Sequence, residues 1–305
     1  MSFSLRQLRH FVCIAEHQNI SSAARELFLS QPALSTSIVQ LEEELGLQLL
    51  IRHHARGVSL TPAGNTFLAQ ARSLIAHAEE VTSSGRALGE SAQGGLEAGC
   101  FSTLSPFFLP SLLVLARKKH PELEVKVSEG PLDELQKLLH NGNIEIALLY
   151  DIELDRTLKR LPMTQVKPHI LLPAAHPLAN QASLSLKALQ NEPFILLDLP
   201  HSRDYFLGFF GKLGFQPKIR HRSQSFELVR GLVASGEGYS ILNLQPASRQ
   251  TYDGGQVRCL SIREKVPALS VVLAYPAGLR QTRRAQAFIS CCQEYFKTPG
   301  RHRTV

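Results

Sequence analysis

The sequence predicts a multi-domain α+β protein, and three patterns along the chain support this prediction. Two short helical segments separated by a tight turn occupy residues 18–45, and a longer helical segment covers residues 63–90. From residue 96 onward, segments rich in strand-forming residues alternate with amphipathic helical segments. This alternation is typical of an α/β fold with largely parallel sheets. The length of 305 residues accommodates two or three such folding units.

The two helical segments at residues 18–45 have the pattern of a helix-turn-helix, whose second helix enters the major groove of DNA. Ser21 or Ser22 is expected to cap the first helix, and Ser30 the second. Pro32 then falls in the first turn of the second helix, where its missing N–H group would have no helical partner in any case. Apolar residues at helical spacing are expected to face the core: Leu34, Ile38, Leu41 and Leu45.

The outer face of the second helix is mostly polar, and it carries Gln31, Ser35, Thr36, Val39 and Gln40. Gln can form two hydrogen bonds to adenine, and Ser or Thr can bond to most bases. This face therefore suits base reading in a DNA groove. An ordinary helical hairpin with a polar outer face would show the same pattern, so residues 18–45 alone leave both interpretations open.

Residues 51–62 have the pattern of two short strands around a basic turn, which is the arrangement of a wing. Arg52 and Arg56 in this segment suit contact with the phosphate backbone or the minor groove. Thr61 and Pro62 are then expected to begin a long helix, with Thr61 as its N-cap. We therefore predict a winged helix-turn-helix domain over residues 1–62.

The long helix has apolar or small residues at a 4-3-4-3 spacing: Phe67, Ala71, Leu74, Ala78, Val81, Gly85 and Leu88. This spacing predicts the seam of a paired helix over about three heptads. A dimer formed in this way would place two recognition helices at symmetric half-sites. Packing of the same face against the rest of the chain is the alternative. Residues 63–90 are predicted as a linker and dimerisation helix, and residues 91–95 as a hinge.

Several short motifs occur in order along residues 1–90. They are Leu5-Arg6-Gln7-Leu8-Arg9-His10-Phe11; Ser21, Ala24 and Leu27; Ser30-Gln31-Pro32-Ala33-Leu34-Ser35; Ile38, Gln40, Leu41 and Glu42; Leu45-Gly46; Arg52; and Leu60-Thr61-Pro62-Ala63-Gly64. Together they resemble the LysR-type transcriptional regulators. The resemblance implies a winged helix-turn-helix, a linker helix and an effector-binding domain. It also implies that Gln31, Pro32, Ser35, Thr36 and Arg52 approach DNA. The family often has Arg at the position of Thr36 and Phe at the position of Leu50, so the contact at Thr36 has less support.

The formal net charge of +7 does not reside in the first 62 residues. Five arginines there are balanced by five glutamates: Arg6, Arg9, Arg25, Arg52 and Arg56 against Glu16, Glu26, Glu42, Glu43 and Glu44. Overall basicity is therefore not evidence for DNA binding. The distribution is more informative, because the acidic triplet ends the second helix, away from Gln31. The N-terminus of that helix also carries a partial positive charge that suits phosphate.

The sequence predicts a cytoplasmic protein without a membrane span. Hydrophobic residues make up 44% of the chain, and no run of about 18 apolar residues occurs. Arg6, Arg9 and His10 interrupt any apolar stretch that could serve as a signal peptide.

Five cysteines are expected to be reduced in this compartment: Cys13, Cys100, Cys259, Cys291 and Cys292. They form no CxxC pair and no zinc spacing, and the adjacent His53 and His54 are expected to be solvated. Cys13 and Cys100 lie in apolar stretches typical of core thiols. We therefore expect no metal and no cofactor, with redox sensing through cysteine as an alternative.

The second half of the chain has eight segments with strand character: Leu96–Ser102, Leu123–Glu129, Ile144–Tyr150, Val166–Leu172, Phe194–Leu197, Lys218–Arg222, Tyr239–Leu242 and Leu269–Tyr275. Helical segments lie between most of them: Phe107–Lys119, Leu132–His140, Arg203–Leu213, Ser225–Ser235 and Thr282–Phe296. The resemblance implies that they form a two-lobed effector-binding domain over residues 96–305, similar to bacterial periplasmic solute-binding proteins. Crossovers near residues 162–167 and 264–270 would divide it into lobe I, about 96–163 and 269–305, and lobe II, about 164–268.

In such a domain the ligand is expected between the lobes, at the C-terminal ends of strands and the N-termini of helices. Residues at those positions are the candidate effector contacts: Ser102, Thr103, Glu129, Tyr150, His201, Ser202, Arg203 and Asn243. Ser102 and Thr103 match positions where family members often touch the effector. His201 and Arg203 could neutralise an anion, and helix N-termini also favour one. Turn and cap chemistry would explain each of these residues equally well.

The predicted function is sequence-specific transcription regulation, controlled by a small anionic metabolite. The expected partners are double-stranded promoter DNA, the effector, a second copy of the chain in a homodimer or homotetramer, and RNA polymerase, but no membrane. An enzyme is disfavoured, since no GxSxG, Walker, GxGxxG or HExxH motif occurs. The alternatives are a redox-responsive regulator of the same architecture and a cytosolic solute-binding protein without a regulatory role.

Overall fold

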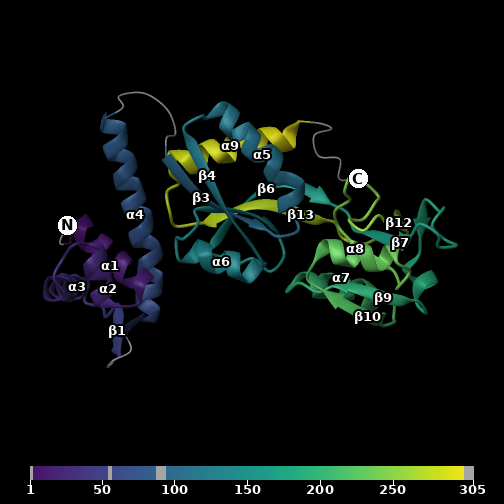
Figure 1. Ribbon diagram of the computed structural model, residues 1–305, viewed down its shortest axis with the longest axis horizontal. Coiled ribbons are helices and arrows are strands. Elements are labelled where there is room, and N and C mark those ends of the chain that lie inside the picture. The colour runs from purple at the N-terminus through teal and green to yellow at the C-terminus, as the bar shows by residue number, and fades with distance from the viewer. Residues whose placement is uncertain (1–2, 54–56, 87–93, 299–305) are drawn as a thin grey trace.

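The elements of the N-terminal part are α1 (Leu5–His17), α2 (Ile20–Glu26), α3 (Gln31–Leu45), β1 (Leu50–His53), β2 (Gly57–Leu60) and α4 (Pro62–Arg86). The computed structural model describes residues 3–53, 57–86 and 94–298. The molecule is elongated, and α4 stands between the helix-turn-helix segment and the first lobe of the C-terminal domain (Figure 1). Arg56, Leu88 and the part of the predicted hinge at residues 91–93 lie outside the described residues.

Helices α2 and α3 form the expected helix-turn-helix, but the cap of α2 differs from the prediction. The Asn19 side chain accepts a hydrogen bond from the Ser22 backbone N–H at 3.0 Å, so Asn19 is the N-cap, and Ser21 and Ser22 lie inside the helix. Extended backbone at Asn19 places its side-chain oxygen within reach of that N–H group. The cap at Ser30 is confirmed, since its hydroxyl accepts from the Ala33 N–H at 3.3 Å.

The predicted inner face of α3 is confirmed. Leu34, Ile38 and Leu41 are buried in the N-terminal core, and Leu45 packs against that core while partly buried. Strands β1 and β2 pair antiparallel and form the wing. Glu42, near the end of α3, accepts hydrogen bonds from the backbone N–H groups of Leu49 and Leu50 at 2.7 and 3.0 Å. This carboxylate therefore fixes the wing to the recognition helix.

The start of α4 shows why a Thr-Pro-Ala-Gly segment occurs there. The Thr61 hydroxyl accepts from the Gly64 N–H at 2.8 Å, which confirms Thr61 as the cap, and it donates to the Gln48 carbonyl at 2.7 Å. A Cβ atom on Gly64 would lie 2.1 Å from the Leu49 carbonyl oxygen. Only glycine therefore lets the helix approach the wing this closely.

The predicted seam along α4 is divided between two environments. Phe67 packs on Phe11 with ring centroids 5.6 Å apart, and Ala71 is buried in the N-terminal core. Leu74 and Val81 are 44% and 72% exposed. The first half of the seam therefore packs against the chain itself, and the second half presents apolar side chains to solvent.

Lobe I contains β3 (Gly94–Phe101), α5 (Ser105–Lys119), β4 (Leu123–Gly130), α6 (Leu132–His140), β5 (Ile146–Tyr150), β6 (Leu158–Val166), β13 (Leu269–Pro276) and α9 (Arg283–Lys297). Its sheet has the order β4-β3-β5-β13-β6. Helices α5 and α9 cover one face and α6 the other (Figure 1). Strand β3 is parallel to both neighbours, as predicted for this part of the sheet. Gly94 and Gly95, predicted in the hinge, begin β3 instead, because they pair with Leu123 and Glu124.

Lobe II contains β7 (His169–Pro173), β8 (Ser183–Leu184), the short 3₁₀ helix η1 (Leu186–Leu189), β9 (Pro193–Leu197), α7 (Ser202–Lys212), β10 (Lys218–Ser223), α8 (Phe226–Ala234), β11 (Ser240–Leu242) and β12 (Val257–Ile262). The prediction of largely parallel sheets is wrong at its centre, where β7 is antiparallel to both β11 and β12. Strands β8 and β12 are not among the predicted strands, and β6 is predicted only in part, as a crossover near residues 162–167. The lobes are joined by β6 and β13, which pair antiparallel along their length.

Candidate DNA interface and effector cleft

The exposed face of α3 is the candidate base-reading surface. Gln31, Pro32, Thr36 and Gln40 are exposed, and Ser35 is half-buried. The Ser21 hydroxyl of α2 donates to the Gln31 side-chain carbonyl oxygen at 3.0 Å. This bond orients the Gln31 amide between the two helices and leaves its NH₂ group as the donor available to a base.

The wing contributes a cation beside this surface. Arg52 is exposed on β1, where its Cα partner on β2 is Val58. Among the described residues, no carboxylate forms an ion pair with Arg52. Its charge is therefore available to a phosphate group.

Phe28 is a residue at this surface that the sequence reasoning did not select. It lies in the turn between α2 and α3, with φ of 54°, and it is 95% exposed. Both properties are unusual for a bulky side chain, since positive φ strains it and exposure leaves its apolar surface in water. The sequence carries no signal of this exposure, because Phe28 stands between Leu27 and Leu29.

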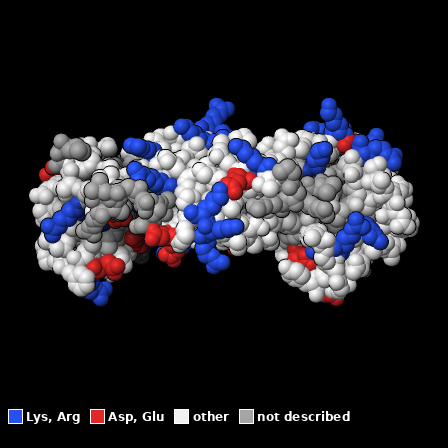
Figure 2. Space-filling view, turned by 90° about the horizontal axis from the view of Figure 1, so that it is seen from above, with Lys and Arg blue, Asp and Glu red and all other residues white. Residues whose placement is uncertain are grey.

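Among the described residues, lysine and arginine are not gathered at the end of the molecule that contains α3. On the face shown in Figure 2 they are spread along the length of the molecule. This agrees with the charge balance within residues 1–62. Specific side chains on α3 and β1, rather than bulk charge, therefore distinguish the candidate interface.

Four of the candidate effector residues meet between the lobes. Thr103 lies in the turn after β3 and Tyr150 ends β5, both in lobe I, and Ser202 and Asn243 come from lobe II. They line a cavity of about 10 Å³ together with apolar side chains: Leu197, Leu199, Phe206, Phe226 and Leu244. A cavity of this size holds at most about one water molecule, so the cleft is closed.

The polar groups of this cleft are uncharged and buried. Thr103, Tyr150, Ser202 and Asn243 are 7%, 4%, 6% and 7% exposed. Burial raises the pKa of Tyr150, and a hydrogen bond with Thr103 partly opposes the shift. The Asn243 side-chain oxygen has no hydrogen-bond partner within the described part of the chain. Because buried polar groups are rarely left unpaired, this oxygen suits a ligand donor.

The other four candidate residues lie outside the lining of the cavity. Ser102 and Glu129 are exposed at the ends of β3 and β4. His201 approaches Glu153 at 2.5 Å between Nδ1 and Oε2, and Arg203 forms an ion pair with Asp198. The two side chains expected to neutralise an effector are therefore already paired with carboxylates.

Two side-chain contacts join the lobes around the cleft, and a third fixes the segment that returns from lobe II to lobe I. The His201–Glu153 pair joins lobe II to the loop that follows β5. Phe107 of α5 meets Phe226 of α8 edge to face, with centroids 5.6 Å apart. The Tyr205 hydroxyl donates to the Pro267 carbonyl at 2.6 Å, just before β13 returns to lobe I. A molecule larger than water could enter this cleft only if these contacts loosened.

The cysteines have the character of core thiols. Cys13, Cys100, Cys291 and Cys292 are buried, and Cys259 is half-buried. Burial raises the pKa of all five thiols, to about 12 at Cys100. A raised pKa reduces the thiolate fraction that oxidants attack.

Among the described residues, no group of three or more His, Cys, Asp or Glu side chains is placed to hold a metal ion. Nor does this part of the chain contain a helix long and apolar enough to cross a membrane.

Both parts of the chain match known families. Residues 5–65 match the family described as "Bacterial regulatory helix-turn-helix protein, lysR family", and residues 89–297 match "LysR substrate binding domain". The crystal structure of HinK, a LysR family transcriptional regulator from Pseudomonas aeruginosa, is similar to this chain with 37% identity and a TM-score of 0.65. That match covers 97% of this chain and 99% of HinK.

Two curated relatives are similar over almost their whole length. The transcriptional regulator YnfL of Escherichia coli is 31% identical over 94% of this chain and 97% of its own. The hydrogen peroxide-inducible genes activator of Pectobacterium carotovorum is 28% identical over 96% of this chain and 97% of its own. The chain belongs to the LysR family and is a ligand-controlled DNA-binding transcriptional regulator with an N-terminal helix-turn-helix and a C-terminal effector-binding domain.

Proposed function

We propose that this regulator reads a pseudo-palindromic promoter site with α3 and the wing of a homodimer, under the control of a small anionic metabolite in the interlobe cleft. The outer face of α3 carries the DNA assignment. It is exposed, it is polar at Gln31, Thr36 and Gln40, and it begins at a capped helix N-terminus. Gln31 and Ser35 would contact base edges. Arg52 and Arg56 would contact phosphate, and Phe28 would contact a thymine methyl group or a sugar.

The exposed half of the α4 seam supports pairing of two chains. Leu74 and Val81 lie seven residues apart on α4, and both are exposed apolar side chains. Their burial against the same residues of a second α4 would remove that surface from water. Homodimers formed in this way would assemble further into homotetramers. The protein would act in the cytoplasm, on promoter DNA and with RNA polymerase as a further partner.

Arg72 supports a path from the effector domain to the DNA-binding domain. This arginine of α4 is 14% exposed and donates to Glu16 of α1 at 2.8 Å. It also donates to the Asn141 carbonyl at 3.0 Å and to the Asn143 side-chain oxygen at 2.6 Å, both in lobe I. One side chain thus joins three parts of the molecule. A ligand that favours one lobe arrangement would act here, through its differential affinity for the two arrangements.

For the effector we propose a small carboxylate held without a protein cation. The cleft offers hydroxyl groups from Thr103, Tyr150 and Ser202, and the N-terminus of α7 adds a favourable partial charge. The unpaired oxygen of Asn243 would accept from a hydroxyl or amino group elsewhere on the same molecule. No metal, cofactor or catalysed reaction belongs to this proposal. Redox control is not proposed, because the thiols are buried and their pKa values are raised.

The DNA assignment is tested by sequencing genomic fragments captured by the purified protein, and then by titrating the enriched site. Gln31→Ala and Ser35→Ala should each reduce discrimination against altered sites, by about 1–3 kcal/mol for a good base contact. Gln224→Ala, at an exposed position in lobe II, is the matched control. Capture without sequence preference, or unchanged discrimination in both α3 variants, would contradict the assignment.

Arg52→Ala tests the phosphate contact separately. It should weaken binding to all sequences alike and reduce the salt slope by about 0.9 for each phosphate that the variant no longer neutralises, or about 2 for a dimer. Arg156→Ala removes the same charge from an exposed site in lobe I and should leave the slope unchanged. The effector is tested by thermal shift with a panel of carboxylates and their neutral amides. Stabilisation by neutral compounds alone would overturn the anionic assignment.

A further inference from the structure

Lobe II contains a second cavity, separate from the interlobe cleft and about 320 Å³ in volume. Its floor is the face of the central sheet formed by His169 and Leu171 of β7, Leu242 of β11, and Val257 and Cys259 of β12. Arg230 of α8 forms one wall, and the loop at residues 244–249 covers the opening. This volume is within the range of small-molecule sites, whereas the interlobe cleft is closed at about 10 Å³.

A buried imidazole without a partner lines this cavity. His169 is 3% exposed, and neither ring nitrogen forms a hydrogen bond within the described part of the chain. Burial and the nearby Arg230 charge lower its pKa to about 3, while the Lys167 backbone opposes the shift. The ring is therefore neutral at physiological pH and offers one donor and one acceptor. Buried polar atoms of this kind are normally paired with protein, water or ligand.

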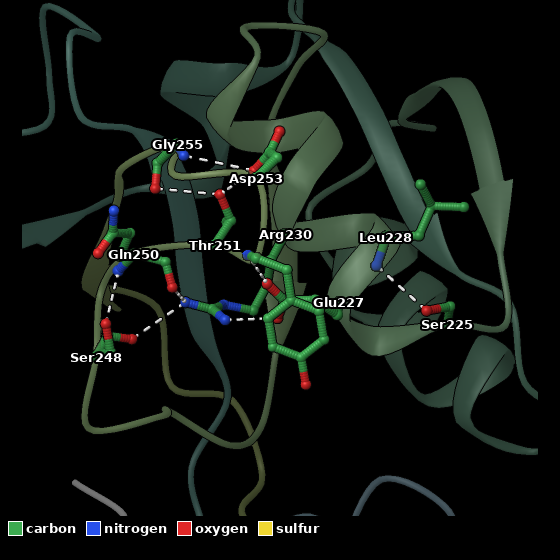
Figure 3. Close-up of polar contacts among 10 residues, drawn as sticks. Ser225, Glu227, Leu228, Arg230, Ser248, Gln250, Thr251, Asp253 and Gly255 are labelled. Carbon is green, nitrogen blue, oxygen red and sulfur yellow. Dashed lines mark hydrogen bonds and ion pairs between the residues drawn. The ribbon is translucent and has the colours of Figure 1, made fainter.

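The charges around the cavity favour an anion. The Arg230 guanidinium is fixed by Glu227 at 2.5 Å and by the carbonyls of Ser248 and Gln250, both at 3.1 Å (Figure 3). Its Nε–H group remains without a partner among the described residues. Arg249 is exposed in the covering loop and forms no ion pair with any described residue. No carboxylate of the described residues lines the cavity, so its lining is positive on balance.

The remainder of the lining is apolar, mainly Leu171, Leu242, Val257 and Pro246. We propose that this cavity is a second small-molecule site, and that it takes an amphiphilic monocarboxylate. The carboxylate would accept a hydrogen bond from the His169 ring, with Arg249 adding positive charge from the covering loop, and the apolar body would lie over the rest of the floor. Charge at one end and apolar surface along the floor select this class over a sugar or a polyanion.

The second cavity and the interlobe cleft share one wall. Leu244 lines both, and the preceding residue, Asn243, belongs to the cleft. Arg230 holds the loop through the carbonyls of Ser248 and Gln250, so the loop is anchored at its far end. A ligand under the loop would contact Leu244 directly. A shift of Leu244 would move the adjacent Asn243 and so change the shape of the interlobe cleft.

Cys259 provides a direct readout of occupancy at this site. It is the half-buried thiol, and the other four are buried. Octanoate in the cavity should therefore protect Cys259 from alkylation by iodoacetamide, and the extent of labelling can be followed by mass spectrometry on the full-length protein. Cys259→Ser measures the background from the other thiols. Protection should saturate at millimolar octanoate, and 1-octanol should protect markedly less.

Substitutions assign the protection to this cavity. Arg249→Gln should weaken octanoate binding about twofold to fivefold, as expected for an exposed ion pair. His169→Leu should weaken it about tenfold through loss of a hydrogen bond to a charged group. Arg258→Gln is the matched control, since Arg258 is adjacent to Cys259 on β12 and its side chain points to the other face. Ser202→Val alters the interlobe cleft and should leave protection intact.

Three results would overturn the proposal. One is the absence of saturable protection by octanoate. Another is the absence of any preference for the carboxylate. It would be seen as equal protection by 1-octanol, or as undiminished protection in both the Arg249 and His169 variants. A third is loss of protection in Ser202→Val, which would place octanoate in the interlobe cleft. None of these measurements involves DNA, so they are independent of the regulatory function proposed above.

Discussion

The buried imidazole of His169 makes the stability of this protein depend on pH. In the folded chain its pKa is lowered to about 3 by burial and by Arg230, whereas an unfolded histidine titrates near pH 6.5. The unfolded state therefore binds one more proton than the folded state between these two values. Stability from this group is fully present above pH 6.5, and it is lost progressively as the pH falls toward 3.

The size of the effect follows from the two pKa values. At pH 5 the pH is about 1.5 units below the pKa of the unfolded histidine, and each unit corresponds to about 1.4 kcal/mol. Moving from pH 8 to pH 5 should therefore lower the free energy of unfolding by about 2 kcal/mol through His169. His169→Leu removes the titrating group and should therefore lose this much less stability on acidification than the parent protein.

The assay is urea unfolding of the full-length chain, followed by far-ultraviolet circular dichroism at pH 8 and pH 5. The chain contains no tryptophan, so fluorescence offers less signal. Gln224→Leu introduces the same side chain at an exposed position in lobe II without removing a titrating group, so it is the control and should keep the parental acid sensitivity. If His169→Leu and the parent lose the same free energy between the two pH values, the burial argument is refuted.

Three further predictions concern other parts of the molecule. Phe28→Asn should raise the free energy of unfolding by about 0.5–1 kcal/mol, because Asn tolerates positive φ, and it should weaken affinity for the enriched DNA site. A lower free energy of unfolding or an unchanged affinity would argue against a strained DNA contact. Arg72→Ala should leave the affinity of the free protein for DNA unchanged but reduce the change in affinity that effector produces; an unaltered effector response would remove Arg72 from the path. Glu153→Gln breaks a partly exposed pair with His201 that is worth up to about 1 kcal/mol. Hydrogen exchange at the start of α7 should therefore increase about twofold to fivefold. Unchanged exchange would mean that other contacts keep the lobes closed.

The starts of α3 and α4 followed from local chemistry, whereas the start of α2 and the missed strands did not. Ser30 and Thr61 could be identified as caps, because a hydroxyl three residues before a backbone N–H group is a local signal. Strand β6 contains Pro162 and several polar residues, so it lacks the pattern of a central strand. In the fold its pairing with β13 shifts register beside Pro162, which is where a strand tolerates proline. Strand β12 was missed because Arg258 and Ser261 interrupt its apolar alternation.

The effector cleft shows the same limit on prediction. Strand ends and helix starts were sufficient to place Thr103, Tyr150 and Ser202 at the cleft, because such positions converge between the lobes of a two-lobed α/β domain; their contact with an effector stays a prediction. The roles of His201 and Arg203 depended on partners that are distant in sequence or hidden in a turn. The pairing with Glu153 and Asp198 exists only in the folded chain. Phe28 was not selected as a surface residue, because an apolar residue between two leucines normally indicates burial.

The docking of lobe I on α4 limits how this regulator can be rebuilt. Gly142 has φ of 66°, and a Cβ atom there would lie 3.1 Å from the Ala69 carbonyl oxygen on α4, beside the contacts of Arg72. A chimera that joins this DNA-binding segment and α4 to a foreign effector domain would need a glycine at the matching turn and carbonyl groups placed for Arg72. Without them the new effector domain would bind its ligand but would not pack on α4, so the ligand would not affect the DNA-binding segment. Sequence choice at one surface turn thus decides which sensors are interchangeable on this scaffold.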